Sequence, residues 1–124
     1  MMIAKATHKP GTMNKTEAAY ADHLELQRRL KQILSYCFEP LKLRLGKKCW
    51  YTPDFLVVNA EGELELHEVK AYWPGKRGKS GRVGGRAGWR EDGRVKWKAA
   101  AARYPFRFVA AWRTRGGWQY EVAQ

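Results

Sequence analysis

The chain has 124 residues, which fits a single domain over residues 1–124, and 44% of them are apolar, enough to build a core. It carries 24 Lys and Arg against 12 Asp and Glu, and this formal net charge of +12 favours a polyanionic partner. No apolar run could span a bilayer, and residues 1–12 lack the apolar stretch of a secretion signal. We therefore expect a soluble, cytoplasmic protein with no membrane partner.

The N-terminal part of the chain is typical of a tail followed by a helix. Residues 1–13 show no periodic pattern and are expected to be flexible. Apolar side chains then recur at helical spacing over residues 16–36, and Asn14 or Thr16 can cap the first turn. Pro40 disfavours helical backbone at the residue before it, so the helix is expected to end before Pro40.

Three strand-like runs follow the helix. Each alternates apolar and polar side chains or is rich in aromatic and β-branched residues, and together they cover residues 41–45, 50–58 and 63–70. The Asn-Ala-Glu-Gly sequence at residues 59–62 is typical of a hairpin turn. We therefore expect the second and third strands to pair side by side.

The second half of the chain is strongly cationic. Residues 1–70 carry 11 basic and 9 acidic side chains, whereas residues 71–124 carry 13 basic and 3 acidic ones. A one-sided charge of this kind attracts polyanions by Coulomb forces and counterion release, and nucleic acid is the leading candidate. A membrane surface is a weaker one, since no helical segment of this half has a bulky apolar face.

Much of this charge falls in residues 74–94, which hold seven Gly and seven Lys or Arg. Such a segment buries too little apolar surface to offset chain entropy, so it is expected to be a mobile basic loop between the third strand and the second helix. Trp73 and Trp89 flank the loop and could stack on exposed bases, although packing of at least one of them against the core is the favoured interpretation. The expected phosphate contacts are Lys76, Arg77, Lys79, Arg82, Arg86, Arg90 and Arg94.

The chain ends with a helix and two strands. Residues 92–103 contain a run of four Ala and predict a helix, which Tyr104-Pro105 ends. Residues 106–112 and 118–122 predict strands on either side of a Gly-Gly turn. The expected order is helix, three strands, helix, two strands.

The residues able to carry chemistry lie on the expected hairpin. Asp54 and Glu68 are each seven positions from residue 61, so strand pairing brings the two carboxylates opposite or nearly opposite one another. Lys70 shares the face of Glu68, and Val69 points into the other layer. Opposed carboxylates repel, and Mg²⁺ would relieve the repulsion because it binds through one or two carboxylates plus waters or phosphate oxygens. With Lys70 at the attacking water or the phosphate, this arrangement suits phosphodiester hydrolysis.

Other polar residues of the hairpin have blander interpretations. His67 alternates away from the face of Glu68 and is expected to be structural. Glu61, Glu63 and Glu65 are expected to be ordinary solvated charges. A surface hairpin with cross-strand Glu–Lys pairs is the competing interpretation of the whole pattern.

Four short motifs also occur in order over about residues 14–112. They are Lys15-Thr16-Glu17, Tyr-Thr-Pro-Asp-Phe at residues 51–55, His-Glu-Val-Lys at residues 67–70, and a Lys-containing helix that ends in Tyr-Pro at residues 95–105. In these motifs the chain resembles the PD-(D/E)XK nuclease superfamily, and more narrowly small phage and prophage endonuclease-like proteins of the Holliday-junction-resolvase type. It departs from that pattern in Ala71, where a Gly often follows the lysine, and in the length of the basic loop.

The resemblance implies an α/β fold with a PD-(D/E)XK restriction-endonuclease-like core, a mixed central sheet flanked by helices. It also implies a DNA endonuclease of phage origin that uses Mg²⁺, or Mn²⁺ in its place, selects branched DNA such as a Holliday junction, and could act as a homodimer. The implied catalytic residues are Asp54, Glu68, Lys70 and Glu17, the implied metal ligands are Asp54, Glu68, Glu17 and the carbonyl of Val69, and Lys96 and Lys98 are implied phosphate contacts.

Alternatives stay open for these added roles and for the function. Glu17 also suits the first turn of any helix, and a solvated helix face explains Lys96 and Lys98 almost equally well. The chain could instead be a catalytically inactive nucleic-acid-binding module, or a phage protein that binds an acidic host protein. Metal titration separates the nuclease from these two, and the salt dependence of DNA binding separates them from each other.

Overall fold

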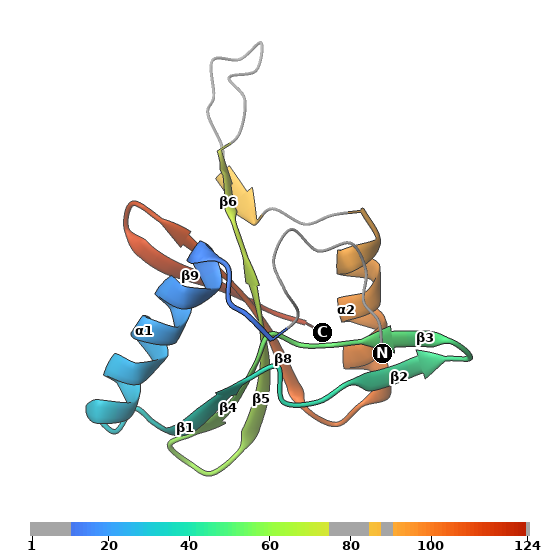
Figure 1. Cartoon of the computed structure of the whole chain (residues 1–124), viewed down its shortest axis with the longest axis horizontal. Coiled ribbons are helices and arrows are strands. Elements are labelled where there is room, and N and C mark those ends of the chain that lie inside the picture. Colours follow the sequence, from blue (N-terminus) through green and yellow to red (C-terminus); the bar gives the residue numbers. More distant parts are fainter. Residues whose placement is uncertain (1–10, 75–84, 88–90, 124) are drawn as a thin grey trace.

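The main sheet of the protein has five strands in the order β1-β4-β5-β8-β9 (Figure 1). The structure is a computed structural model that describes residues 11–74, 85–87 and 91–123. Strands β5 and β8 run parallel, and the other neighbouring pairs of this sheet are antiparallel. The expected mixed α/β sheet is therefore confirmed. Its elements are α1 (Lys15–Arg29), β1 (Ile33–Phe38), β4 (Phe55–Asn59), β5 (Leu64–Lys70), α2 (Glu91–Arg103), β8 (Arg107–Thr114) and β9 (Gly117–Val122).

The two helices cover opposite faces of this sheet, because alternate residues of each central strand point to opposite sides. Tyr20 and Leu24 of α1 pack in a buried cluster with Val57 of β4 and Val69 of β5. On the other face, Trp97 of α2 packs in a second cluster that includes Leu66 of β5. Consecutive residues of β5 thus enter different layers, which decides what each of its polar side chains meets.

Helix α1 begins at a capping box and is shorter than predicted. The side chain of Asn14 accepts a hydrogen bond from the Glu17 backbone N–H, and the Glu17 carboxylate accepts one from the Asn14 backbone N–H. The prediction of a helix over residues 16–36 is confirmed as far as Arg29 and is wrong beyond it, since Lys31 has a φ of 62° and Ile33–Phe38 forms β1. Pairing with β4, a contact distant in sequence, overrides the local helical spacing there.

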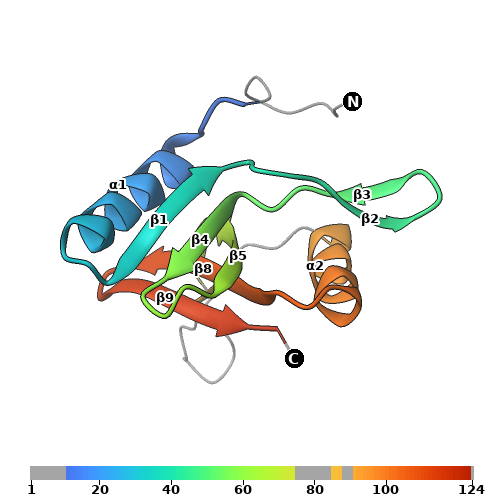
Figure 2. The same cartoon turned by 90° about the horizontal axis from the view of Figure 1, so that it is seen from below.

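A separate two-stranded sheet, β2 (Leu43–Gly46) with β3 (Cys49–Tyr51), reaches beyond the main sheet and lies against α2 (Figures 1 and 2). This ribbon corrects two predictions. The run at residues 41–45 does not join the main sheet, and the single strand over residues 50–58 is divided into β3 and β4. Pro53 lies in the break and has no backbone N–H to donate to a ladder. We call residues 41–51 the arm.

The described parts of the segment that was expected to form one basic loop have regular structure. β6 (Tyr72–Pro74) pairs with β7 (Gly85–Ala87), and α2 begins at Glu91. Residues 75–84 and 88–90 lie outside the described residues. The expected N-terminal tail lies outside them up to residue 10.

Candidate active site

The hairpin of β4 and β5 has the register that the sequence predicts. Phe55 pairs with His67 at the start of β4, so the next position along the hairpin brings Asp54 beside Glu68. The turn is held by Asn59, whose side-chain oxygen accepts hydrogen bonds from the backbone N–H groups of Glu61 and Glu63. The predicted meeting of Asp54 and Glu68 is confirmed by this register.

Asp54 is held in place by the backbone of β5. Asp54 is the residue just before β4, and its Oδ2 accepts a hydrogen bond of 2.8 Å from the Val69 N–H. The side chain thus takes a position that a strand carbonyl would otherwise fill. Burial raises the pKa of Asp54 well above its ordinary value, and the negative charge of Glu68 raises it further. The ionised form of Asp54 is therefore disfavoured in this position.

Glu68 is buried between a hydroxyl and an ammonium group. The Tyr51 hydroxyl donates a hydrogen bond of 2.5 Å to Glu68 Oε1, and Lys70 Nζ lies 3.1 Å from Glu68 Oε2. Burial and the adjacent carboxylate raise the pKa of Tyr51, so its hydroxyl stays protonated and donates the hydrogen bond to Glu68. The predicted common face of Glu68 and Lys70 is confirmed, as is the position of Val69 in the opposite layer.

Glu17 approaches the same place from α1. It is buried, with 7% of its surface exposed, although it belongs to the first turn of a helix. Its negative charge is among those that raise the pKa of Asp54, so Glu17 lies within electrostatic range of that carboxylate. Glu17 therefore combines a local capping role with a position beside the hairpin residues.

We call Asp54, Glu68 and Lys70 the acidic site. The charge of Glu68 disfavours the ionised form of Asp54, and carboxylate oxygens are the donors that Mg²⁺ prefers. Among the described residues, no three His, Cys, Asp or Glu side chains converge closely enough to form a complete cation site. Two carboxylates suffice for Mg²⁺, because waters and phosphate oxygens fill its other positions. The donor set of the acidic site therefore fits a hard divalent cation, which Asp54 and Glu68 would hold.

The cations predicted to contact nucleic acid divide into two groups. Those at positions 76, 77, 79, 82 and 90 lie outside the described residues, and no side-chain position is described for Arg86. On α2, Arg94 forms two hydrogen bonds of 2.9 and 2.6 Å with Glu121 of β9, and the charge of Lys98 helps to lower the pKa of Glu121. Lys96 is partly exposed on the same helix.

Glu121 lies on the same row of the sheet as the acidic site. Ala110 pairs with Glu68 on one side and with Glu121 on the other. From the spacing of strands, the Cα atoms of Glu68 and Glu121 are roughly 10 Å apart. The ion pair of Arg94 therefore ties α2 to the face of the sheet that carries the acidic site.

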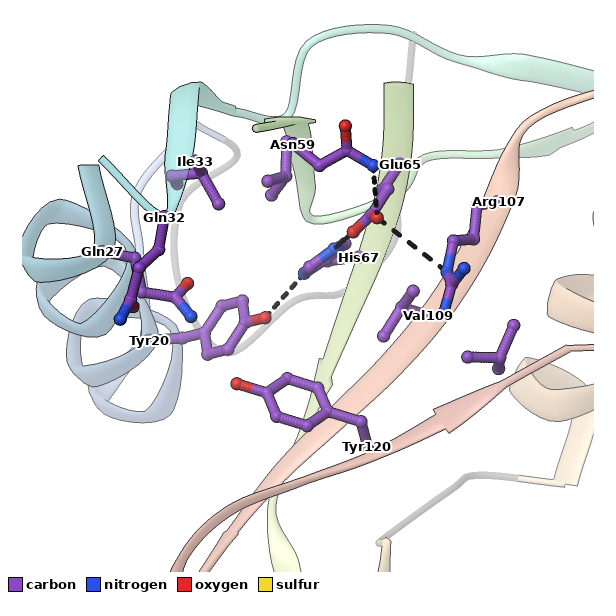
Figure 3. Close-up of a pocket in the computed structure, with 12 residues that line it drawn as sticks. Tyr20, Gln27, Gln32, Ile33, Asn59, Glu65, His67, Arg107, Val109 and Tyr120 are labelled. Atoms are coloured by element: carbon purple, nitrogen blue, oxygen red, sulfur yellow. Dashed lines mark hydrogen bonds and ion pairs between the residues drawn. The ribbon is translucent and has the colours of Figure 1, made fainter. Parts of the chain in front are cut away.

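A second polar cluster lies on the α1 face of β5, and we call Tyr20, His67 and Glu65 the tyrosine–histidine network (Figure 3). His67 Nε2 lies 2.8 Å from Glu65 Oε1, and His67 Nδ1 lies 2.6 Å from the Tyr20 hydroxyl. With the Nε2–H directed at the Glu65 carboxylate, Nδ1 accepts a hydrogen bond from the Tyr20 hydroxyl. The structural role expected for His67 agrees with these contacts.

The prediction that Glu65 is an ordinary solvated charge is wrong. Its side chain is only 16% exposed, and the hydrogen bond to His67 lowers its pKa, with the Asn59 amide adding to the effect. Glu65 shares the face of His67 because the two are two positions apart on a strand. The sequence contains that alternation, but only the packing of Tyr20 from α1 shows that this end of β5 is covered.

The network borders a cavity of about 370 Å³ (Figure 3). Tyr120 and Arg107 line it together with Gln27 and Gln32 of the α1 end. The Tyr120 hydroxyl lies 2.8 Å from His23 Nε2, and Arg107 Nε lies 3.9 Å from Glu65 Oε2. The lining residues that pair with one another are Tyr20, His67, Glu65, Asn59 and Arg107.

Sequence reasoning missed Tyr51 as part of the acidic site. Tyr51 was quoted only as the first residue of the Tyr-Thr-Pro-Asp-Phe motif, and its hydrogen bond to Glu68 joins positions 17 apart in the chain. Period-two alternation in β3 is the available signal, since it sends Tyr51 inward and Trp50 outward. Which group the inward hydroxyl would meet depended on where the arm folds.

Comparison with family models, with curated proteins and with solved structures finds no match. No helix in the described parts of the chain is long and apolar enough to cross a membrane.

Proposed function

We propose that this protein is a Mg²⁺-dependent endonuclease that hydrolyses phosphodiester bonds of DNA, with the acidic site as its active site. The observation that carries the proposal is the pair of neighbouring carboxylates, Asp54 and Glu68, with Lys70 Nζ 3.1 Å from Glu68. Like charges side by side in a partly buried position are unfavourable for folding, and such perturbed groups gather at functional sites.

The roles of the side chains follow from their contacts. Asp54 and Glu68 would hold the cation, Glu17 and the Val69 carbonyl are the candidates to complete its surroundings, and the Tyr51 hydroxyl orients the Glu68 carboxylate. Bound Mg²⁺ polarises a phosphoryl oxygen and lowers the pKa of a water. Lys70, beside Glu68, is placed to orient the attacking water and to contact the negatively charged phosphate.

The arrangement of elements supports assignment of the fold to the PD-(D/E)XK type. Helix α1, strands β1, β4 and β5, helix α2 and strand β8 reproduce the order helix, three strands, helix, strand. In this assignment the arm is an insertion between the first and second core strands. Branched DNA is the proposed substrate class, since the motifs resemble those of junction-resolving enzymes.

The test is cleavage of a labelled four-way DNA junction and of a linear duplex with the same arms, in Mg²⁺ and in EDTA, by wild type and by Asp54→Ala. We expect cleavage that requires Mg²⁺, prefers the junction and is lost in the variant. Equal cleavage of both DNAs would leave the nuclease and remove the branched substrate. Binding without cutting in Mg²⁺ and in Mn²⁺ would replace the nuclease with the inactive binding module.

A further inference from the structure

The arm is a cationic projection with no acidic residue. Lys42, Arg44, Lys47 and Lys48 lie within residues 41–51, which contain no Asp or Glu. All four side chains are exposed. The two-stranded sheet extends beyond the main sheet, and only one side of it lies on α2 (Figure 2). A concentration of like charge on one projection is unfavourable by itself and suits a polyanion.

The arm has an inner and an outer face, which its register defines. Leu43 pairs with Tyr51, and both side chains are buried in the cluster that contains Trp97 of α2. Arg44 pairs with Trp50, and both are exposed. The inner face therefore anchors the arm to the domain, while the outer face presents an arginine beside a tryptophan.

Trp50 is an exposed aromatic side chain among cations. It is 49% exposed, and the Arg44 guanidinium lies 5.9 Å from the centre of its ring. The half-exposed ring leaves an aromatic face in water, on which a flat group such as a base can stack. Aromatic rings beside basic groups are the recurring means of holding unpaired nucleotides, through base stacking and phosphate contact.

The arm is fixed in place and leads into the acidic site. The Tyr104 hydroxyl donates a hydrogen bond of 2.6 Å to the Arg44 carbonyl, and Arg103 donates one to the Leu45 carbonyl. At the base of the arm, the Tyr51 hydroxyl bonds to Glu68. Trp50 is the residue immediately before Tyr51, so the stacking position and the acidic site are joined through adjacent residues of one strand.

We propose that the outer face of the arm binds DNA by stacking an unpaired base on Trp50 while Arg44, Lys47 and Lys48 contact the backbone phosphates. This inference rests on the proposed function in one respect: the DNA held by the arm is the substrate of the acidic site. Among branched DNAs, it favours as substrates those with unpaired nucleotides beside the cleaved strand, such as flaps, gaps and junctions whose base pairs open at the branch point.

The experiment measures binding by the full chain in EDTA, where no metal-dependent cutting occurs, to a DNA flap with 2-aminopurine in its unpaired strand. Trp50→Ala is compared with Trp50→Phe, which keeps a stacking ring, and with Leu34→Ala, which removes another exposed apolar side chain, 56% exposed on β1. We expect Trp50→Ala to weaken flap binding roughly tenfold and to abolish quenching of the 2-aminopurine, with Phe restoring most of both.

The phosphate contacts are tested by salt dependence. The double variant Lys47→Gln/Lys48→Gln should reduce the slope of log K against log salt by roughly 1.5, and Lys31→Gln, an exposed lysine beyond α1, should leave it unchanged. Unchanged flap binding by Trp50→Ala, or an equal loss on a blunt duplex, would overturn the stacking proposal. Cleavage by wild type in Mg²⁺ is measured separately. A protein that does not cleave DNA but whose flap binding still requires Trp50 would refute the nuclease proposal and leave the stacking proposal in place.

Discussion

Strand β5 contributes to two hydrogen-bonded clusters on opposite faces, and the pKa of a carboxyl group is shifted in opposite directions in the two clusters. In the tyrosine–histidine network, a donor meets an acceptor at each step, and the pKa of Glu65 is lowered. In the acidic site, two carboxylates meet, and the pKa of Asp54 is raised. The hydrogen bonds of the first cluster therefore stabilise the folded state, whereas the repulsion between the carboxylates of the second destabilises it.

In each cluster a tyrosine hydroxyl from another element bonds to β5, and β5 supplies a glutamate. Residue type alone therefore does not distinguish the two clusters. What distinguishes them is whether the folded protein prefers the charged form. We propose that a bound divalent cation relieves the repulsion between the two carboxylates of the acidic site.

The largest expected effect is on cleavage, and it is seen when a glutamate on each face of β5 is replaced in turn by glutamine. Glu68→Gln keeps the shape of the side chain but removes its charge beside Lys70, so cleavage should fall by about 10²–10³-fold, as when one group that stabilises a transition state is lost. Glu65→Gln, the matched control three positions earlier, should cleave within a few-fold of wild type. A similar fall in both variants would show that the comparison reflects folding.

The next expected effect is on stability, where Glu65→Gln, the control for cleavage, is the variant expected to lose free energy of unfolding. Glu65→Gln loses a charge-assisted hydrogen bond to His67 and should lower the free energy of unfolding by about 1–2 kcal/mol at neutral pH. Because the folded-state pKa of Glu65 is lowered, this contribution is present above the ordinary value of 4.5 and is lost as pH falls through the folded-state pKa.

The measurement is urea unfolding of wild type and Glu65→Gln from neutral pH down to about pH 3. The difference between the two proteins should shrink as Glu65 becomes protonated. A difference that stays constant across this range would assign the loss to packing and would contradict the electrostatic account of the network.

A third prediction concerns the cation itself. At Mg²⁺ concentrations roughly tenfold above the dissociation constant, binding to the folded state alone should add about 1.4 kcal/mol to stability. The double variant Asp54→Asn/Glu68→Gln should show no such gain, and Glu65→Gln should keep it. Isothermal calorimetry or a thermal shift with Mg²⁺ and Ca²⁺ measures this without any cleavage assay.

The smallest expected effect is a gain in stability. Asp54→Asn removes one of the two opposed charges and can still accept the hydrogen bond from the Val69 N–H, so without metal it should be more stable by about 0.5–1 kcal/mol. Thermal unfolding in EDTA is the measurement. A loss of stability would mean that the charge of Asp54 helps the fold, and the proposed conflict in the acidic site would be wrong.

The hairpin was the part of the site that the sequence could predict. Asn59 and Gly62 form its turn through contacts within five residues, and Gly62 has a φ of 85° that a glycine adopts readily. Because the side-chain period of a strand is two, this turn also decided the register and the faces of Glu68 and Lys70. Local chemistry was sufficient to bring Asp54 beside Glu68.

The remaining features depended on contacts between distant segments. Residues 33–38 have side chains compatible with a helix or a strand, and only pairing with β4 decided for β1. Likewise Tyr51 reached Glu68, and Tyr20 reached His67, because the arm and α1 packed on opposite faces of β5. The sequence by itself determined the turn, the alternation and the charge of each segment. The tertiary structure decided which buried carboxylate met a partner and which met another carboxylate, since burial and proximity set that difference.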